Sequence, residues 1–269
     1  MTRDNEQQEK WALILGASSG FGAACARALA EAGMNIFGVH LDLKATLPKA
    51  REVVADIEAL GRQAVFFNTN AADERKRRRV LDRMEEILQA SKPPGVVRVM
   101  LHSLAFGTLL PFIAENGEGE ISQAQMEMTL NVMAHSLVYW VQDLVRRKML
   151  VRGSKVFSMT SAGSHRVIVG YGAISAAKAA LESHTRQLAL ELAPAGIAVN
   201  CIQAGVTDTP AMRRIPNSDQ IIAEALKRNP SGRITRTEDV AQALVALSSP
   251  NVSWITGSII RVDGGEDMI

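Results

Sequence analysis

Short apolar runs alternate with longer helical patterns along almost the whole chain. Residues 11–15 form an apolar run, glycines follow, and an alanine-rich helical pattern continues to Gly33. Strands that alternate with helices in this way predict a parallel sheet with helices on both faces. We therefore expect an α/β fold, a Rossmann-type doubly wound parallel sheet of about seven strands. The predicted strands are 11–15, 35–40, 63–67, 96–101, 155–158, 197–202 and one from 258, and the predicted helices are 23–32, 48–60, 73–89, 122–145, 171–192, 219–228 and one from 236.

The segments between these elements predict one domain. Residues 93–95 and 115–120 are loops rich in proline, glycine or charge, and neither is long enough for an interdomain linker. The polar residues 1–10 are predicted to form a disordered tail, and residues 11–269 a single dinucleotide-binding catalytic domain. Because no apolar run reaches about 18 residues, a signal peptide and a membrane span are both disfavoured.

The composition is that of an ordinary soluble globular protein, with 47% hydrophobic and 22% charged residues. A net charge of +2 gives no argument for nucleic-acid binding. Cys25 and Cys201 lie inside apolar runs and match no metal or redox spacing. We therefore expect two small core residues, no metal site and a location in the reducing cytoplasm.

Three glycines follow the first predicted strand and precede the first predicted helix. In this context Gly16 allows a tight turn, Gly20 lets the backbone approach a pyrophosphate, and Gly22 lets the helix pack closely on the strand. The alternative is a plain turn between a strand and a helix. The predicted cofactor-binding residues of this turn are Gly16, Ser18, Ser19, Gly20, Phe21 and Gly22.

The end of the second predicted strand carries the residues expected to meet the adenosine ribose. His40 ends the strand, and Asp42 and Lys44 follow it. An acid at this place hydrogen-bonds the ribose 2′-hydroxyl, whereas a basic residue accommodates a 2′-phosphate. Because both types are present, the residues leave the choice between NADH and NADPH open.

Tyr171 and Lys178 are seven positions apart in a predicted helix, which at ~100° per residue is about two turns. Their side chains are therefore expected on one face, roughly 10 Å apart along the helix axis. A phenol can donate a proton, and a nearby cation lowers its pKa. The alternative is an amphipathic helix whose Tyr and Lys carry no chemistry.

Residues 74–79 contain the densest positive charge of the chain. Acidic residues follow at helical spacing, so a solvated helix surface with ion pairs is favoured over a docking patch for an acidic carrier. His102, His165 and His184 are expected to be loop or surface residues rather than catalysts.

Several motifs in the same order resemble the short-chain dehydrogenase/reductase family across residues 12–265. They are the glycine turn, Asn131 with Val132, the helix with Tyr171 and Lys178, and Val-Asp-Gly-Gly at 262–265. Ordinary members place the Lys four residues after the Tyr. The interval of seven, together with residues 101–107 and 203–205, is similar to enoyl-acyl-carrier-protein reductases, most of all to type III.

The resemblance implies hydride transfer from NADPH, which is preferred, or NADH to a 2-enoyl thioester in fatty-acid or polyketide metabolism. Tyr171 would donate to the thioester oxygen, and Lys178 would hold the nicotinamide ribose. It also implies a homotetramer. The acyl group of the substrate would be carried by acyl carrier protein or coenzyme A. The other implied cofactor-binding residues are Asn70, Ala71, Ser103, Leu104, Thr207 and Thr209, and the implied substrate residues are Ser161, Phe106 and Met212.

Two other functions stay open. One is a carbonyl reductase or alcohol dehydrogenase on the same fold, because the argument from the interval between Tyr171 and Lys178 rests on a single feature. The other is a nucleotide-binding regulator without turnover. Ser158 and Ser161 both fall near the catalytic Ser position of ordinary members, and Asn131 matches either a proton-relay or a structural position.

Overall fold

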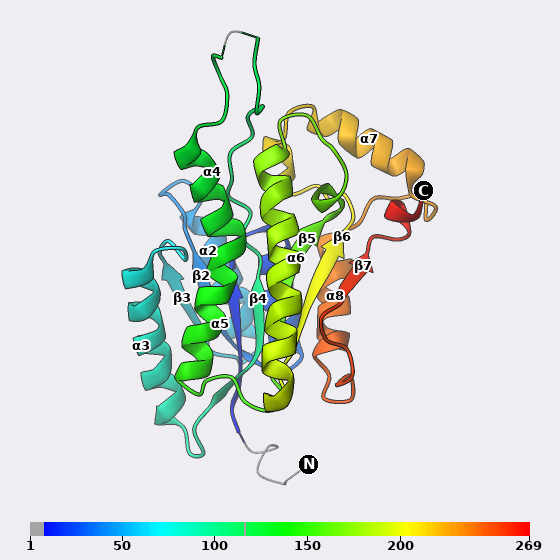
Figure 1. Cartoon of the computed structure of the whole chain (residues 1–269). Coiled ribbons are helices and arrows are strands. Elements are labelled where there is room, and N and C mark those ends of the chain that lie inside the picture. Colours follow the sequence, from blue (N-terminus) through cyan, green and yellow to red (C-terminus); the bar gives the residue numbers. More distant parts are fainter. Residues whose placement is uncertain (1–7, 116) are drawn as a thin grey trace.

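In the computed structural model, which describes residues 8–115 and 117–269, seven parallel strands form a sheet in the order β3-β2-β1-β4-β5-β6-β7 (Figure 1). The predicted doubly wound α/β fold is therefore confirmed. The strand order reverses between β1 and β4, and in such sheets ligands bind beyond the carboxyl ends of the strands at this point. The strands are β1 (Lys10–Leu15), β2 (Asn35–His40), β3 (Ala64–Asn68), β4 (Val96–His102), β5 (Lys155–Ser161), β6 (Ala198–Ala204) and β7 (Ile259–Val262).

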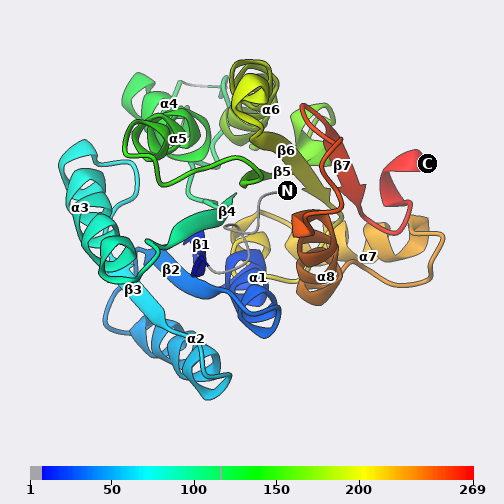
Figure 2. The same cartoon turned by 90° about the horizontal axis from the view of Figure 1, so that it is seen from below.

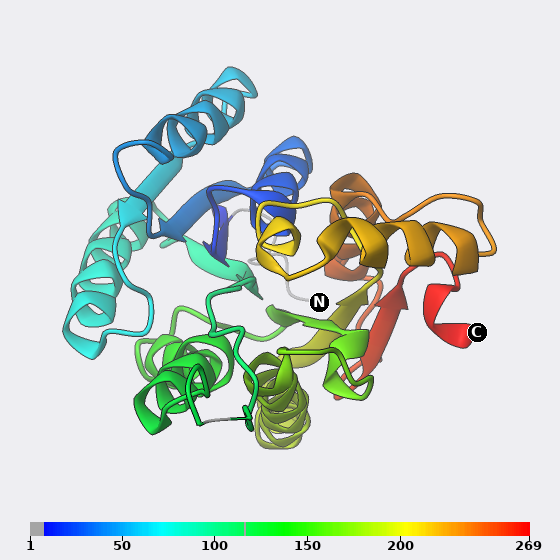
Figure 3. The same cartoon turned by 90° about the horizontal axis from the view of Figure 1, so that it is seen from above.

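Helices cover both faces of the sheet, as the views from below and above show (Figures 2 and 3). Alternate residues of β1 explain why: Trp11, Leu13 and Leu15 belong to one apolar core, and Ala12 and Ile14 to the other. α7 lies above the carboxyl ends of β6 and β7 (Figure 1). The helices are α1 (Gly20–Glu31), α2 (Leu47–Ala59), α3 (Glu74–Ala90), α4 (Gln123–Leu130), α5 (Ser136–Arg146), α6 (Gly172–Leu192), α7 (Ser218–Arg228) and α8 (Thr237–Ser248).

The helix predicted at 122–145 is not continuous. A π-helical segment, η2 (Asn131–His135), separates α4 from α5, and Asn131 is its first residue. At its end the Ser136 hydroxyl donates to the carbonyl oxygen of Val132 at 2.8 Å. Such segments occur frequently at functional sites, and hydrophobic periodicity does not reveal them because the helix axis continues through them.

The basic run at the start of α3 is mostly exposed, as predicted, but the acidic residues that follow it pair elsewhere: Asp82 and Glu85 with Arg147, and Glu86 with Arg83. Arg78 pairs with Glu74 at 2.5 Å on the exposed surface. Arg77 differs from the prediction because it is buried, and it pairs with Asp143 of α5 at 2.8 Å. The run therefore fastens α3 to α5 as well as facing solvent.

The remaining sequence predictions concern the termini, the cysteines and the membrane. Residues 1–7 of the predicted tail lie outside the described residues, and Lys10 already belongs to β1. Cys25 and Cys201 are buried, as predicted. Among the described residues, no helix is both long enough and apolar enough to cross a membrane.

Candidate active site

The turn between β1 and α1 requires glycine. Gly16 has a φ of +92°, and an added Cβ would overlap the carbonyl oxygen of Ser103. A Cβ on Gly22 would overlap the carbonyl oxygen of Gly16, and one on Gly20 would lie 3.6 Å from the Thr209 side chain. The backbone of this turn therefore packs directly on α1 and on the segment after β4.

The start of α1 is open to an anion. Ser19 is the N-cap residue, and its side chain makes no capping hydrogen bond within the described part of the chain. The first backbone N–H groups of α1 are thus available to a phosphate, which the helix dipole also favours. A cavity of about 510 Å³ begins at Ser18, Gly20 and Thr209, but it extends between α1, α2 and α8 and reaches neither Tyr171 nor Lys178. The free N–H groups of α1 and the glycine turn, not this cavity, therefore fit the diphosphate of a dinucleotide.

The end of β2 presents a carboxylate to the adenosine side of this turn. Nδ1 of His40 lies 2.8 Å from a carboxylate oxygen of Asp42. Burial acts to raise the pKa of Asp42, but hydrogen bonds from Thr46, Ser18 and His40 outweigh it and hold the pKa below its usual range. Asp42 is therefore ionised at neutral pH, whereas Lys44 is exposed.

The predicted adenine neighbours lie in the turn after β3. The Asn70 side-chain oxygen accepts a hydrogen bond from the backbone N–H of Ala72 at 2.9 Å. Ala71 is buried, and its carbonyl oxygen accepts from the indole N–H of Trp140 at 2.9 Å. Contacts within the protein thus fix the shape of this turn.

Tyr171 is the N-cap residue of α6, and its ring lies against Gly163. A Cβ on Gly163 would lie 2.6 Å from Cε1 of Tyr171 and 3.2 Å from the hydroxyl oxygen of Ser161. Burial raises the pKa of Tyr171, and the neighbouring Ser161 hydroxyl acts in the opposite direction. The phenol is therefore protonated at neutral pH and can serve as a donor.

Lys178 lies two turns further along α6 and is buried. Its ammonium donates to the carbonyl oxygen of Met159 at 2.6 Å. Burial lowers the pKa of Lys178 to about 8. Because Met159 and Ser161 both belong to the end of β5, Tyr171 and Lys178 face the same edge of the sheet.

The two candidate serines have different surroundings. The Ser158 hydroxyl is buried, 3.1 Å from Oγ1 of Thr185 and 3.0 Å from Sγ of Cys201. The Ser161 hydroxyl is also buried and, among the described residues, has no partner in hydrogen-bonding geometry. Ser161 is thus the serine that lies beside the Tyr171 ring, whereas Ser158 is engaged in the core.

The prediction that His102 is a loop or surface residue is wrong. It ends β4, is fully buried, and its Nε2 lies 2.8 Å from the Ser136 hydroxyl. Burial lowers the pKa of His102 to about 3, and the charge of Lys178 acts in the same direction. The prediction failed because β4 is a central strand covered by helices on both faces. His165 is half-exposed, and His184 contacts His135 at 2.9 Å.

The other predicted residues lie at the same edge with different degrees of burial. Thr207 and Thr209 follow β6 and are buried, and Thr209 Oγ1 accepts from the backbone N–H of Met212 at 3.2 Å. Ser103 and Leu104 follow β4 beside the glycine turn, and Phe106, further along, is 54% exposed.

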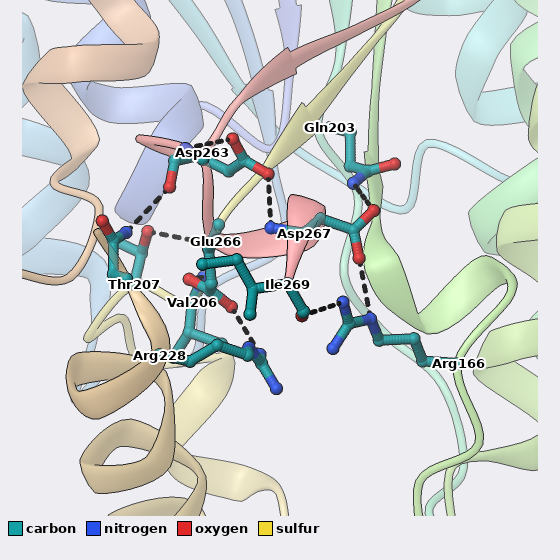
Figure 4. A network of polar contacts seen from close by, with 12 residues as sticks. Arg166, Gln203, Val206, Thr207, Arg228, Asp263, Glu266, Asp267 and Ile269 are labelled. Atoms are coloured by element: carbon teal, nitrogen blue, oxygen red, sulfur yellow. Dashed lines mark hydrogen bonds and ion pairs between the residues drawn. The ribbon is translucent and has the colours of Figure 1, made fainter. Parts of the chain in front are cut away.

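Two functional candidates carry no sequence signal. Glu266 and Asp267 lie in the last turn of the chain and contact the segments after β5 and β6 (Figure 4). Only the sheet topology brings the end of the chain to this edge, so spacing could not have identified them. No group of three or more His, Cys, Asp or Glu side chains that could hold a metal ion occurs in the described ranges.

The sheet, the glycine turn and the buried Tyr and Lys define an oxidoreductase that uses a nicotinamide dinucleotide. A family profile described as "Enoyl-(Acyl carrier protein) reductase" matches residues 16–266. The chain belongs to the short-chain dehydrogenase/reductase family, as the sequence motifs indicated.

Similar proteins of known activity act on alcohols or carbonyls, as their names state. The chain is 30% identical to the cis-4-hydroxycyclohexanecarboxylate dehydrogenase of Sinomonas cyclohexanicum, over 96% of each chain. It is 27% identical to the L-xylulose reductase of Bos taurus, over 94% of this chain and 95% of that protein. By name, these relatives favour the carbonyl or alcohol alternative over enoyl reduction.

Solved structures of similar fold include a short-chain dehydrogenase and an enoyl reductase. The short-chain dehydrogenase of Burkholderia cenocepacia in complex with NADP is 28% identical, with a TM-score of 0.81 over 97% of this chain and 98% of that chain. The enoyl-[acyl-carrier-protein] reductase (NADH) of Aquifex aeolicus has a TM-score of 0.81 over 97% and 98%, at 22% identity. The second similarity shows the fold alone.

Proposed function

We propose that this oxidoreductase uses NADH to reduce the carbon-carbon double bond of a 2-enoyl thioester. The interval of seven residues between Tyr171 and Lys178 carries the proposal. Compared with the ordinary interval of four, it adds about one helical turn between phenol and ammonium. An enoyl thioester accepts hydride at a carbon remote from the oxygen that gains charge, so its donor must lie further from the hydride position than for a ketone.

The side chains at the edge of the sheet have separate tasks in this reaction. When bound, reduced nicotinamide supplies the hydride that adds to the β carbon. Tyr171 donates to the thioester oxygen, where negative charge develops, and a preorganised donor stabilises that charge most strongly. Lys178 holds the ribose hydroxyls, and the backbone of Thr207 meets the carboxamide. A proton from solvent then adds to the α carbon of the enolate, which completes the reduction.

The protonation state of Tyr171 fits a donor in the reduction of either an enoyl or a carbonyl group. Burial raises the pKa of Tyr171, and Ser161 alone among the described residues acts to lower it. A protonated phenol can donate to a developing oxyanion, whereas oxidation of an alcohol needs a phenolate as base.

Asp42 supports NADH rather than the NADPH that the resemblance favoured. Its carboxylate is held ionised at the end of β2, where it can accept from a ribose 2′-hydroxyl and repel a 2′-phosphate. Asp42→Asn should therefore narrow the difference between the dissociation constants of NADH and NADPH. An unchanged ratio would contradict this role.

Carbonyl reduction is the second candidate, and the names of the curated relatives favour it. The same donor, Tyr171, could protonate the alkoxide that forms when hydride adds to a ketone. The homotetramer, the acyl carrier and the role in fatty-acid metabolism stay predictions.

Steady-state oxidation of NADH and NADPH separates these candidates. We expect a trans-2-butenoyl thioester to be reduced at least about tenfold faster than the matched 3-oxobutanoyl thioester, which corresponds to ~1.4 kcal/mol in the barrier. Tyr171→Phe should lower the rate about 100-fold or more while NADH still binds. The reverse substrate preference would support carbonyl reduction, and binding without turnover of either thioester would support a regulator.

A further inference from the structure

The last turn of the chain holds two adjacent, buried carboxylates that point in different directions (Figure 4). Glu266 and Asp267 begin the turn η6 (Glu266–Met268) directly after Gly264 and Gly265. Asp263 fixes the turn, because its carboxylate accepts from the backbone N–H groups of Gly265 at 2.9 Å and Asp267 at 3.1 Å. Asp263 therefore fixes the backbone that carries both carboxylates.

Asp267 contacts the segment that leads to Tyr171. One carboxylate oxygen accepts from Nε of Arg166 at 2.7 Å, and the other lies 3.0 Å from Nε2 of His165. Both partners follow the short turn η3 (Ala162–Ser164), which contains Gly163, the residue against which the Tyr171 ring packs. Movement of this segment would therefore move the surface that positions the phenol.

Asp267 also joins this segment to the central sheet. The side-chain amide of Gln203, on β6, donates to its carboxylate at 2.8 Å, and Arg261 of β7 lies 3.5 Å away. Burial acts to raise the pKa of Asp267, but Gln203, His165 and Arg166 outweigh it and hold the pKa below its usual range. The carboxylate is therefore ionised at neutral pH, and its bonds are charge-assisted.

Glu266 contacts a different segment, the one that follows β6. One oxygen accepts from the backbone N–H of Val206 at 2.9 Å, and the other from Nη2 of Arg228, at the end of α7, at 3.1 Å. A Cβ on Gly205 would lie 2.9 Å from the carboxylate, so the backbone passes directly over it. Thr207 is the next residue after Val206.

We propose that Glu266 and Asp267 are positioning residues that act on two different parts of the reaction. Asp267 holds the segment after β5, and through it the Tyr171 phenol. Glu266 holds the segment after β6, and through it the backbone at Thr207 and the end of α7. This rests on the proposed function, because Tyr171 and Thr207 are assigned to donor and cofactor there.

Hydrogen exchange on the protein without substrate tests the proposal separately from the reaction. Asp267→Asn should speed amide exchange in residues 162–171, and Glu266→Gln should speed it in residues 203–209. If either carboxylate variant does not fold, Arg166→Gln and Arg228→Gln each remove one of its contacts from a partly exposed partner. If both variants speed exchange in the same residues, or if neither variant speeds it, the proposal is overturned even if turnover is never detected.

Kinetics with whichever thioester is reduced supplies the second measurement. Asp267→Asn should lower kcat about tenfold or more with an unchanged dissociation constant for NADH, because small displacements of a reacting group are costly. Glu266→Gln should raise that dissociation constant about fivefold with a smaller change in kcat. Asp267→Glu, which keeps the charge, should recover part of kcat.

A matched control separates positioning from loss of stability. Asp143→Asn removes a buried ion pair with Arg77 that lies between α3 and α5. It should lower the free energy of unfolding without changing kcat or NADH binding. If the carboxylate variants behave like Asp143→Asn, Glu266 and Asp267 only stabilise the fold, and the proposal is wrong.

Discussion

The cofactor side and the substrate side of this edge are built in different ways. Around the glycine turn, backbone packs on backbone, so Gly16 and Gly22 have no room for any side chain. On the substrate side, the Tyr171 ring lies beside Gly163 and the Ser161 hydroxyl, and the Asp267 side chain holds Arg166 in the same connecting segment. Backbone shape therefore constrains the cofactor side strictly, whereas the substrate side depends on contacts that substitutions can change one at a time.

The largest expected effect follows from the cofactor side. Gly22→Ala introduces a Cβ that overlaps the carbonyl oxygen of Gly16, and neither backbone can move without shifting the start of α1 against β1. We expect NADH affinity to fall about 100-fold or more, a loss of ~2.7 kcal/mol or more in binding free energy. Isothermal titration with NADH measures it.

Gly33→Ala is the control for backbone strain. Gly33 has a φ of +93° at the end of α1, and a Cβ there meets nothing within 4 Å. It should cost about 1 kcal/mol of unfolding free energy and leave NADH binding unchanged. Equal loss of binding in both variants would show that general destabilisation explains the Gly22 result.

This difference also explains how much the sequence could reveal. The parallel α/β fold and the glycine turn follow from local patterns, because each strand, helix and glycine motif spans a short stretch of the chain. Helix geometry predicts that Tyr171 and Lys178 share one face of their helix, and the parallel sheet predicts that ligands lie at the carboxyl ends of its strands.

Contacts between distant segments could not be read in this way. Burial of His102 depends on helices that cover β4, and Ser158 and Ser161 are distinguished only by what α6 and β6 bring beside them. Glu266 comes to Val206 through the pairing of β6 with β7. None of these contacts has a local pattern, so topology was needed to find them.

An effect on stability rather than on cofactor binding is expected at His102, the last residue of β4. Its pKa is about 3 in the folded protein and about 6.5 in the unfolded chain, which therefore binds one more proton between these values. Stability is thus lost as pH falls from 6.5 toward 3, by up to roughly 4 kcal/mol. Urea unfolding of the cofactor-free protein from pH 7 to pH 4 measures this loss. The free energy of unfolding should depend less on pH in His102→Asn than in the wild type.

Ser136→Ala serves as the control for His102. It removes the hydrogen-bond partner but leaves the buried imidazole, so it should lower stability without removing the pH dependence. If the unfolding free energies of wild type and His102→Asn fell in parallel with pH, the folded protein would accommodate protonated His102. Water would then reach this part of the core.

The smallest effect separates the two serines. Ser161→Ala removes the hydroxyl beside Tyr171 and should lower kcat about tenfold, whereas Ser158→Ala should keep kcat within about twofold and cost about 1 kcal/mol of unfolding free energy. Because Ser161 acts to lower the pKa of Tyr171, its loss should move the decline of kcat at high pH to still higher pH. A Ser158→Ala enzyme with the shifted pH profile, and a Ser161→Ala enzyme without it, would reverse the assignment and place the substrate side deeper along β5.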